Sequence, residues 1–114
     1  MVARNTLLTA PPYPVEETLR RLGAHLRRAR LRRNLTIASV AGKIGTGPRA
    51  VADAEKGKGS TGIAVYMALL WAYGLLNQMA PVADPVRDEH GRILASVQER
   101  SRARSSDGDM DSDF

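Results

Sequence analysis

The 114-residue sequence predicts an all-α fold, in which a compact domain of five short helices follows an extended arm and precedes a partly disordered tail. Apolar residues recur at steps of three and four, which is the period of an amphipathic helix. Glycine, proline, threonine or asparagine stands where the periodic segments begin or end, as helix boundaries require. Aromatic residues make up only 4% of the chain, so Leu, Val, Ile and Ala must fill the core.

The first predicted helix covers residues 15–33. It follows an arm, residues 1–14, that we expect to be extended because it contains three prolines. Asn34 should end the helix, since asparagine tolerates the left-handed conformation better than most residues. One face of this helix is apolar and consists of Leu19, Leu22, Leu26 and Ala29.

Two short helices joined by a glycine-rich turn are predicted next. Thr36 is suited to cap the first of them, and Gly45 to end it. Pro48 fits the first position of the following helix, where its missing N–H costs nothing, and Gly57 closes that helix. Small side chains should let the two helices approach closely, namely Ala41, Gly45, Ala50 and Ala54.

The turn between these helices has a geometric purpose. It lets the second helix leave the first at a steep angle and protrude, as in motifs that place a helix in the major groove of DNA. An ordinary helical hairpin in a small all-α protein is the alternative, and this arrangement alone does not decide between them.

A fourth helix is predicted from a cap at Ser60 or Thr61 to a stop at Gly74. Residues 75–80 should form a short fifth helix, which Pro81 stops. The residues of the fourth helix expected to face the core are Ile63, Tyr66, Met67, Leu70 and Tyr73.

These elements divide the chain into four parts. The arm is followed by a domain that covers residues 15–81. Residues 82–104 form an extension with a helical pattern from residue 88 onward, weakened by a glycine. Residues 105–114 are rich in Ser, Gly and Asp with little to bury, so we expect an acidic, disordered tail.

Positive charge is concentrated in the first half, because residues 1–58 hold 12 Arg or Lys against 4 Asp or Glu. This asymmetry points to a polyanionic partner, either nucleic acid or an anionic membrane surface, while a merely solvated surface remains equally open. The longest uncharged apolar block, residues 63–76, has 14 residues and is too short to cross a bilayer. The chain has no cysteine and no signal-peptide pattern, so we expect a cytoplasmic protein.

No arrangement of residues predicts catalysis, a cofactor or a metal site. Residues 57–62, GKGSTG, match a dinucleotide-binding pattern, but no strand precedes them, so we interpret them as a loop. His25 and His90 lie in different segments without a ligand or nucleophile nearby. The alternating aspartates of the tail lack the distal glutamate of a calcium loop. We therefore do not expect an enzyme.

A set of residues spread over roughly residues 19–78 has a characteristic joint spacing. The set is Leu22-Gly23, Arg30, Leu35-Thr36, Val40-Ala41, Ile44-Gly45, Val51, Glu55, Gly57 and Gly74-Leu75. This spacing resembles the Cro/C1-type (XRE) helix-turn-helix family. The resemblance implies a lambda-repressor-like fold, a transcriptional repressor that binds double-stranded operator DNA, and a buried ion pair between Arg30 and Glu55.

The resemblance also assigns roles at the DNA. The positions that face bases are Pro48, Arg49, Ala50 and Asp53, and those that face phosphates are Thr36, Gly47, Lys56 and Lys58. Arg49 is the one long donor able to fork onto guanine, and Asp53 could accept from cytosine or orient Arg49. Ile37 departs from the family, which usually has a backbone-clamping Gln there. Solubility is the alternative role for the two lysines.

A DNA-binding domain with one short recognition helix gains affinity by dimerising on a two-fold site. We therefore expect a homodimer formed through the fifth helix and the residues after it. The second half of the chain carries YMALLWAYGLL, ADP and DEHG, at residues 66–76, 83–85 and 88–91. These are similar to parts of small XRE proteins encoded beside HipA-type kinase toxins, which implies an antitoxin that holds a HipA-like kinase. A stand-alone repressor, or a helical protein-interaction module that does not bind DNA, remains the alternative.

Overall fold

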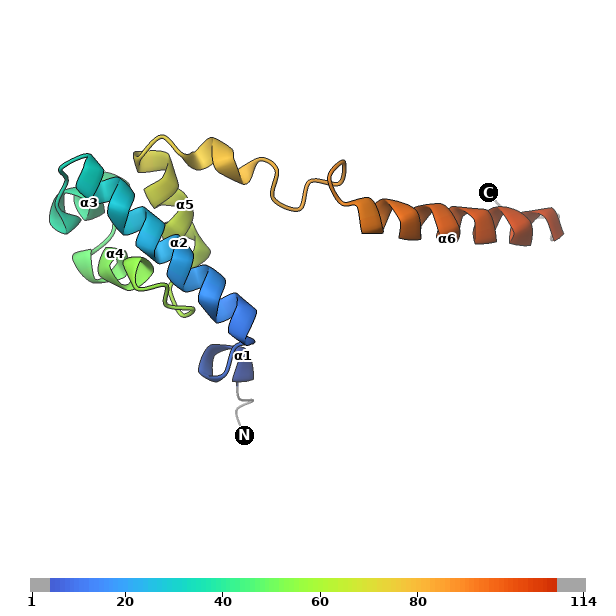
Figure 1. The fold of residues 1–114 in the computed structure, drawn as a ribbon, viewed down its shortest axis with the longest axis horizontal. Coiled ribbons are helices and arrows are strands. Elements are labelled where there is room, and N and C mark those ends of the chain that lie inside the picture. Colours follow the sequence, from blue (N-terminus) through green and yellow to red (C-terminus); the bar gives the residue numbers. More distant parts are fainter. Residues whose placement is uncertain (1–4, 109–114) are drawn as a thin grey trace. The chain divides into compact units, whose positions relative to one another are not determined.

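The computed structural model describes residues 5–108, and these residues contain helices and turns but no strand (Figure 1). The all-α prediction is therefore confirmed. The chain divides into two units, Met1–Asn77 and Gln78–Phe114. The described part of the first unit contains α1 (Thr6–Thr9), α2 (Tyr13–Arg32), α3 (Ile37–Ile44), α4 (Pro48–Glu55) and α5 (Ile63–Ala72). The 3-10 helix η1 (Leu76–Met79) spans the boundary, and the second unit contains α6 (Glu89–Gly108).

The arm differs from the prediction. Within its described residues one helical turn, α1, replaces the expected extended chain, and α2 begins at Tyr13 rather than at residue 15. Pro12 is the N-cap of α2, and Pro14 lies in its first turn, where the backbone N–H groups have no intrahelical acceptor. The prolines therefore start the helix instead of preventing it. Residues 1–4 lie outside the described part.

The predicted boundaries of α3 and α4 are confirmed. The Oγ1 of Thr36 accepts a hydrogen bond from the N–H of Ser39 at 3.0 Å, and the Oγ of Ser39 accepts one from the N–H of Thr36 at 3.2 Å. Gly45 ends α3 with φ +82°, in the left-handed region that glycine adopts without strain. Pro48 is the first residue of α4, after the N-cap Gly47.

The start of α5 was predicted wrongly. The N–H of Thr61 donates to the carbonyl of Lys58 at 3.2 Å, so residues 58–61 form a turn and α5 begins later, after Gly62. No side chain caps α5. The short fifth helix predicted at residues 75–80 is present as the 3-10 helix η1.

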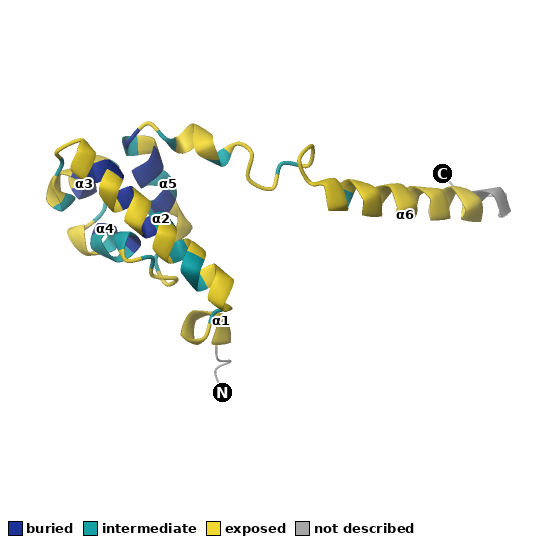
Figure 2. Cartoon of the chain, viewed as in Figure 1, coloured by how far each residue is buried: buried dark blue, intermediate teal, exposed yellow. Residues whose placement is uncertain are grey.

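Helices α2 to α5 enclose the core of the first unit (Figure 2). Its most deeply buried large side chains are Leu26, Val40, Val51 and Leu69. Ile63, which we expected in the core, is 69% exposed, and Met67 is only partly buried. Leu69 takes the inward position instead. The error has a clear origin, because α5 is apolar on all sides and periodicity then does not select a face.

Small residues lie at two helix contacts, and only the contact between α3 and α4 was predicted. Ala41 and Ala54 are buried as expected, but Gly45 is exposed, with open space where a Cβ would stand. The tight contact is between α2 and α4. A Cβ on Gly23 would lie 2.6 Å from the carbonyl oxygens of both Ala54 and Glu55, so only glycine allows α4 to lie this close to α2.

The second unit is mainly the helix α6. The carboxylate of Asp88 accepts a hydrogen bond from the N–H of Gly91 at 3.0 Å and so caps the helix. Gly91 leaves room for this carboxylate, which explains a glycine in the first turn. The helix continues through residues 105–108, part of the predicted disordered tail, and residues 109–114 lie outside the described part. The three large apolar side chains of α6 are about half exposed: Ile93, Leu94 and Val97.

An ion pair between Arg30 and Glu55 joins α2 to the end of α4. Arg30 Nε donates to one carboxylate oxygen of Glu55 at 2.7 Å, and Nη2 donates to the other at 3.0 Å. A third donor, Nη1, bonds to the carbonyl of Leu35 at 3.0 Å. Both charged side chains are less than a tenth exposed. The hydrogen bond with Glu55 raises the pKa of Arg30 against the opposing effect of burial, so the guanidinium stays charged.

Replacing either member of this pair alone should destabilise the domain strongly. Glu55→Ala leaves a buried cation without a counter-charge, and we expect a loss of about 3–5 kcal/mol in the free energy of unfolding. The double variant Arg30→Met/Glu55→Ala should cost less than the sum of Arg30→Met and Glu55→Ala, because no charge is then stranded. Urea unfolding of the four proteins measures this, and additive costs would contradict a coupled pair.

The two buried tyrosines of the α5 region have opposite hydrogen-bonding states. The hydroxyl of Tyr66 donates to the carbonyl of Lys58 at 2.9 Å, whereas the buried hydroxyl of Tyr73 has no hydrogen-bond partner among the described residues. Arg33 contacts Tyr73 differently, donating to its backbone carbonyl at 2.9 Å with the guanidinium 5.6 Å from the ring centroid.

Removing the two hydroxyls should therefore shift stability in opposite directions. Tyr66→Phe loses a hydrogen bond and should cost about 0.5–1.5 kcal/mol, while Tyr73→Phe relieves an unpaired buried group and should be neutral or stabilising. Burial raises the pKa of both hydroxyls, so stability should fall as the pH rises past about 10, where the unfolded chain ionises first. Thermal unfolding of the wild type and both variants between pH 7 and 11 measures the pH dependence and the two substitution effects. A destabilised Tyr73→Phe protein would contradict the predicted relief of an unpaired hydroxyl.

Candidate nucleic-acid interface

Helix α4 has one buried and one exposed face. Val51 and Ala54 are fully buried against the core, while Gly47, Pro48 and Arg49 at the start of the helix are exposed. The Arg49 side chain is 87% exposed. The sequence-predicted base-facing residues Pro48 and Arg49 therefore project from the surface, and Ala50 is partly covered.

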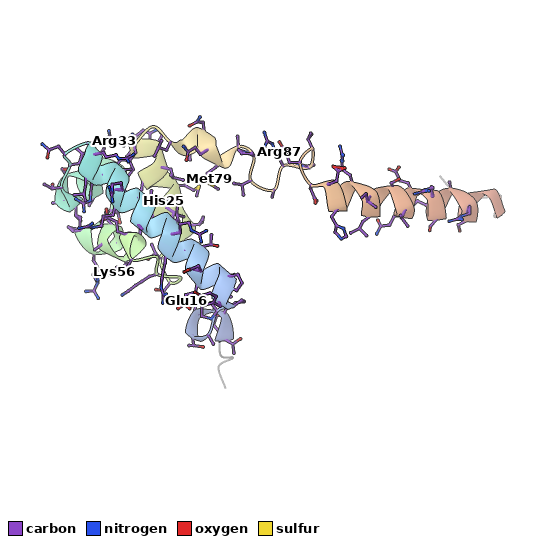
Figure 3. All side chains as sticks on the ribbon, in the orientation of Figure 1. Glu16, His25, Arg33, Lys56, Met79 and Arg87 are labelled. Atoms are coloured by element: carbon purple, nitrogen blue, oxygen red, sulfur yellow. The ribbon has the colours of Figure 1, made fainter. Side chains whose placement is uncertain are left out.

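The sequence-predicted phosphate-facing residues lie at three places around α4. Thr36 caps α3 with its oxygen as the acceptor, so its hydroxyl hydrogen is left for another partner. Gly47 precedes the first turn of α4. Lys56 is the exposed C-cap of α4 and is labelled in Figure 3, and Lys58 follows in the loop.

Asp53 brings together two residues that the sequence places nine positions apart. Its Oδ2 lies 3.8 Å from the Nε of Arg49, and its Oδ1 lies 3.4 Å from the Nζ of Lys58. The link to Arg49 follows from helical spacing and was predicted. The link to Lys58 was not, because it depends on how the loop after α4 turns back.

The backbone fixes that loop. The carbonyl of Asp53 accepts hydrogen bonds from the N–H groups of both Lys56 and Lys58, each at 3.1 Å. Gly57, between them, has φ +73° and packs so closely on α2 that a Cβ would lie 2.5 Å from the carbonyl oxygen of Leu19. The hydroxyl of Tyr66 holds the carbonyl of Lys58 from α5. Lys58 is thus held close to Asp53 by main-chain contacts.

Sequence reasoning did not single out Lys43 and Trp71. Trp71 on α5 is 57% exposed, and the Nζ of Lys43 on α3 lies 6.0 Å from its ring centroid. This distance allows a cation–π contact, which at an exposed site is weak. Lys43 and Trp71 lie on different helices, so no local spacing in the sequence indicates the contact.

Other kinds of site find little support in the described residues. His25 lies midway along α2 and is exposed (Figure 3), and His90 lies in α6. Residues 5–108 contain no cluster of three or more His, Asp or Glu side chains placed to hold a metal ion. No helix within that range combines the length and hydropathy needed to cross a membrane.

Comparison with known proteins gives one finding. The model of a family described as a helix-turn-helix domain matches residues 21–80, which is just over half of the chain. The matched segment contains most of α2 and all of α3, α4, α5 and η1. No curated protein and no solved structure is significantly similar to the chain. The match includes α3, the turn after it, and α4 with its exposed face. The chain therefore belongs to the helix-turn-helix domain family.

Proposed function

We propose that the protein is a sequence-specific transcriptional repressor that places α4 in the major groove of operator DNA. The helix-turn-helix domain indicates DNA binding and transcription regulation. The observation that carries the finer proposal is the start of α4, where Arg49 is 87% exposed while the opposite face of the same helix is buried. Intracellular action on DNA is part of this proposal.

The side chains have distinct roles in this proposal. Arg49 reads guanine through a bidentate pair with O6 and N7, and Pro48 and Ala50 offer small apolar surfaces of the kind that fit beside a thymine methyl. The phosphate contacts come from Thr36, Gly47, Lys56 and Lys58, which position the domain without reading sequence. Asp53 lies within reach of Arg49, so accepting from cytosine and orienting Arg49 are both compatible with its place.

Selection of duplexes from a random pool, followed by sequencing, tests the main proposal. A repressor should enrich one motif, and methylation protection should place its contacts in the major groove. An enriched pool without a shared motif would leave only non-specific binding. Failure to retain any duplex at low salt would favour the alternative, a helical protein-interaction module.

Two variants should separate reading from positioning. Arg49→Ala should weaken binding to the selected site by about 1–3 kcal/mol and relax the preference at one base pair. Lys58→Ala should weaken all duplexes alike and reduce the slope of log K against log salt by about 1. Fluorescence anisotropy over a salt series measures both effects. An unchanged base preference in the Arg49 variant would show that this residue does not read sequence.

We also propose a homodimer whose two α4 helices contact successive major grooves, roughly 34 Å apart. A single helix of this length reads few base pairs, so a two-fold site increases both affinity and specificity. Sedimentation at micromolar concentration should show a dimer without DNA, and the selected motif should be an inverted repeat. A monomer together with an asymmetric motif would contradict this.

A second candidate function is that of an antitoxin for a HipA-like kinase, as the resemblance implies. The observation that favours it is α6, a 20-residue helix whose apolar residues Ile93, Leu94 and Val97 are 48–57% exposed. A helix with so thin an apolar stripe gains stability by packing on another chain. The kinase toxin is the partner that we propose for it, and a stand-alone repressor remains the alternative.

Truncation after Ala83 should separate the two activities. If α6 carries the toxin contact and the dimer contact lies before Pro81, the shortened protein should still bind the selected duplex but lose neutralisation of a kinase encoded beside it. Replacing Ile93 and Val97 by serine in the full chain is the companion variant, because it removes apolar surface and keeps the length. It should also lose neutralisation. Full neutralisation by the truncated protein would contradict the role of α6.

A further inference from the structure

We infer that Asp53 is a specificity-determining residue that restrains both Arg49 and Lys58 and so disfavours non-specific DNA more than the operator. This inference rests on the proposed function and deepens it. It replaces the two roles that the sequence left open for Asp53, acceptance from a base or orientation of Arg49 alone, with one that involves the base-reading and the phosphate-facing residue together.

The geometry places one carboxylate between two cations. Asp53 uses Oδ2 toward Arg49 at 3.8 Å and Oδ1 toward Lys58 at 3.4 Å. The Asp53 side chain is 21% exposed, against 87% for Arg49 and 45% for Lys58, so the anion is the most sheltered member of the group. At these distances the contacts are ion pairs at a partly exposed site, which DNA can displace.

The electrostatic effect differs between the two kinds of DNA. Non-specific binding comes almost entirely from cations that neutralise phosphates. A cation that is already paired with Asp53 gains less from a phosphate, and the carboxylate itself repels phosphate. Asp53 therefore weakens every phosphate contact of Arg49 and Lys58.

Only the operator offers compensation. There Arg49 exchanges the carboxylate for a bidentate pair with guanine, whose geometry a phosphate backbone in the wrong register does not provide. The penalty on Arg49 is then offset at the operator and remains at other sequences, whereas the penalty on Lys58 is the same for both kinds of DNA. Specificity is a difference of affinities, so a group that weakens the wrong complex raises it as effectively as one that strengthens the right complex.

The fold does not need the Asp53 carboxylate, which makes the residue testable. The loop is anchored by the main-chain carbonyl of Asp53 and by the hydroxyl of Tyr66, and neither contact uses the carboxylate. Asp53→Asn keeps the shape of the side chain and removes its charge. We therefore expect this variant to fold with an unchanged circular dichroism spectrum and melting temperature.

Glu17→Gln is the matched control, since it removes the same formal charge from the same domain. Glu17 forms no ion pair among the described residues and only accepts a long hydrogen bond from Tyr13, at 3.5 Å. Glu16 is less suitable, because it pairs with Arg20 and lines the same cavity as Lys58.

The experiment uses the full chain as wild type, Asp53→Asn and Glu17→Gln. Each is titrated with the selected duplex and with a shuffled duplex of equal length and composition, over a series of KCl concentrations. Asp53→Asn should tighten binding to the shuffled duplex by about threefold or more and steepen its salt dependence by about 0.9 for each cation released to phosphate. Binding to the selected duplex should change less, so the ratio of the two dissociation constants should fall.

Several outcomes would overturn the inference. An unchanged ratio in Asp53→Asn would remove the proposed role while leaving the proposed function intact. An equal effect of Glu17→Gln on the ratio would show that net charge alone, and not the position of Asp53, causes the change. A changed preference at one base pair, without tighter binding to the shuffled duplex, would make Asp53 a base reader. A wild-type protein that binds neither duplex would contradict the proposed function itself.

Discussion

The orientation of α4 depends on the buried pair of Arg30 and Glu55. Arg30 lies near the end of α2, Glu55 is the last residue of α4, and the carbonyl of Leu35 from the connection to α3 completes the set of acceptors. Three hydrogen bonds from one guanidinium thus join three successive parts of the chain. Such a pair adds little net stability compared with apolar side chains of the same size. Its contribution is to fix the orientation of α4, because this helix cannot turn about its own axis without breaking the bidentate contact.

A fixed α4 determines what the surface presents. The glycine contact at Gly23 lets α4 lie against α2, and Val51 and Ala54 close its inner side. Arg49 then has to point outward, since it lies on the opposite face of the helix. The loop after α4 is equally constrained by Gly57 and by the hydroxyl of Tyr66, and this brings Lys58 back beside α4. The exposed groups of the proposed interface are therefore held in place by buried ones.

The features that the sequence predicted correctly are local. Caps and stops such as Thr36, Gly45 and Pro48 follow from the conformational preferences of single residues. Two of the failures arose where a choice depends on the whole domain. The inward face of α5 could not be read from a segment that is apolar on every side, and the Asp53–Lys58 contact depends on the path of a loop. The base-facing and phosphate-facing roles came from family resemblance, and they remain proposals.

The two acidic residues of α4 both need a nearby cation, one in the core and one at the surface. Asp53 and Glu55 both lie in the last turn, where the partial negative charge of the helix end disfavours a carboxylate. Each is matched by a cation from outside the helix: Glu55 pairs with Arg30 in the core, and Asp53 pairs with Lys58 at the surface. The first turn of α4 contains no acidic residue, so Arg49 and the positive end of the helix dipole form the end that attracts an anion. The charge of this eight-residue helix therefore differs between its two ends. Asp53 and Glu55 are neutralised at the C-terminal end, and Arg49 is exposed at the N-terminal end, which we propose contacts DNA.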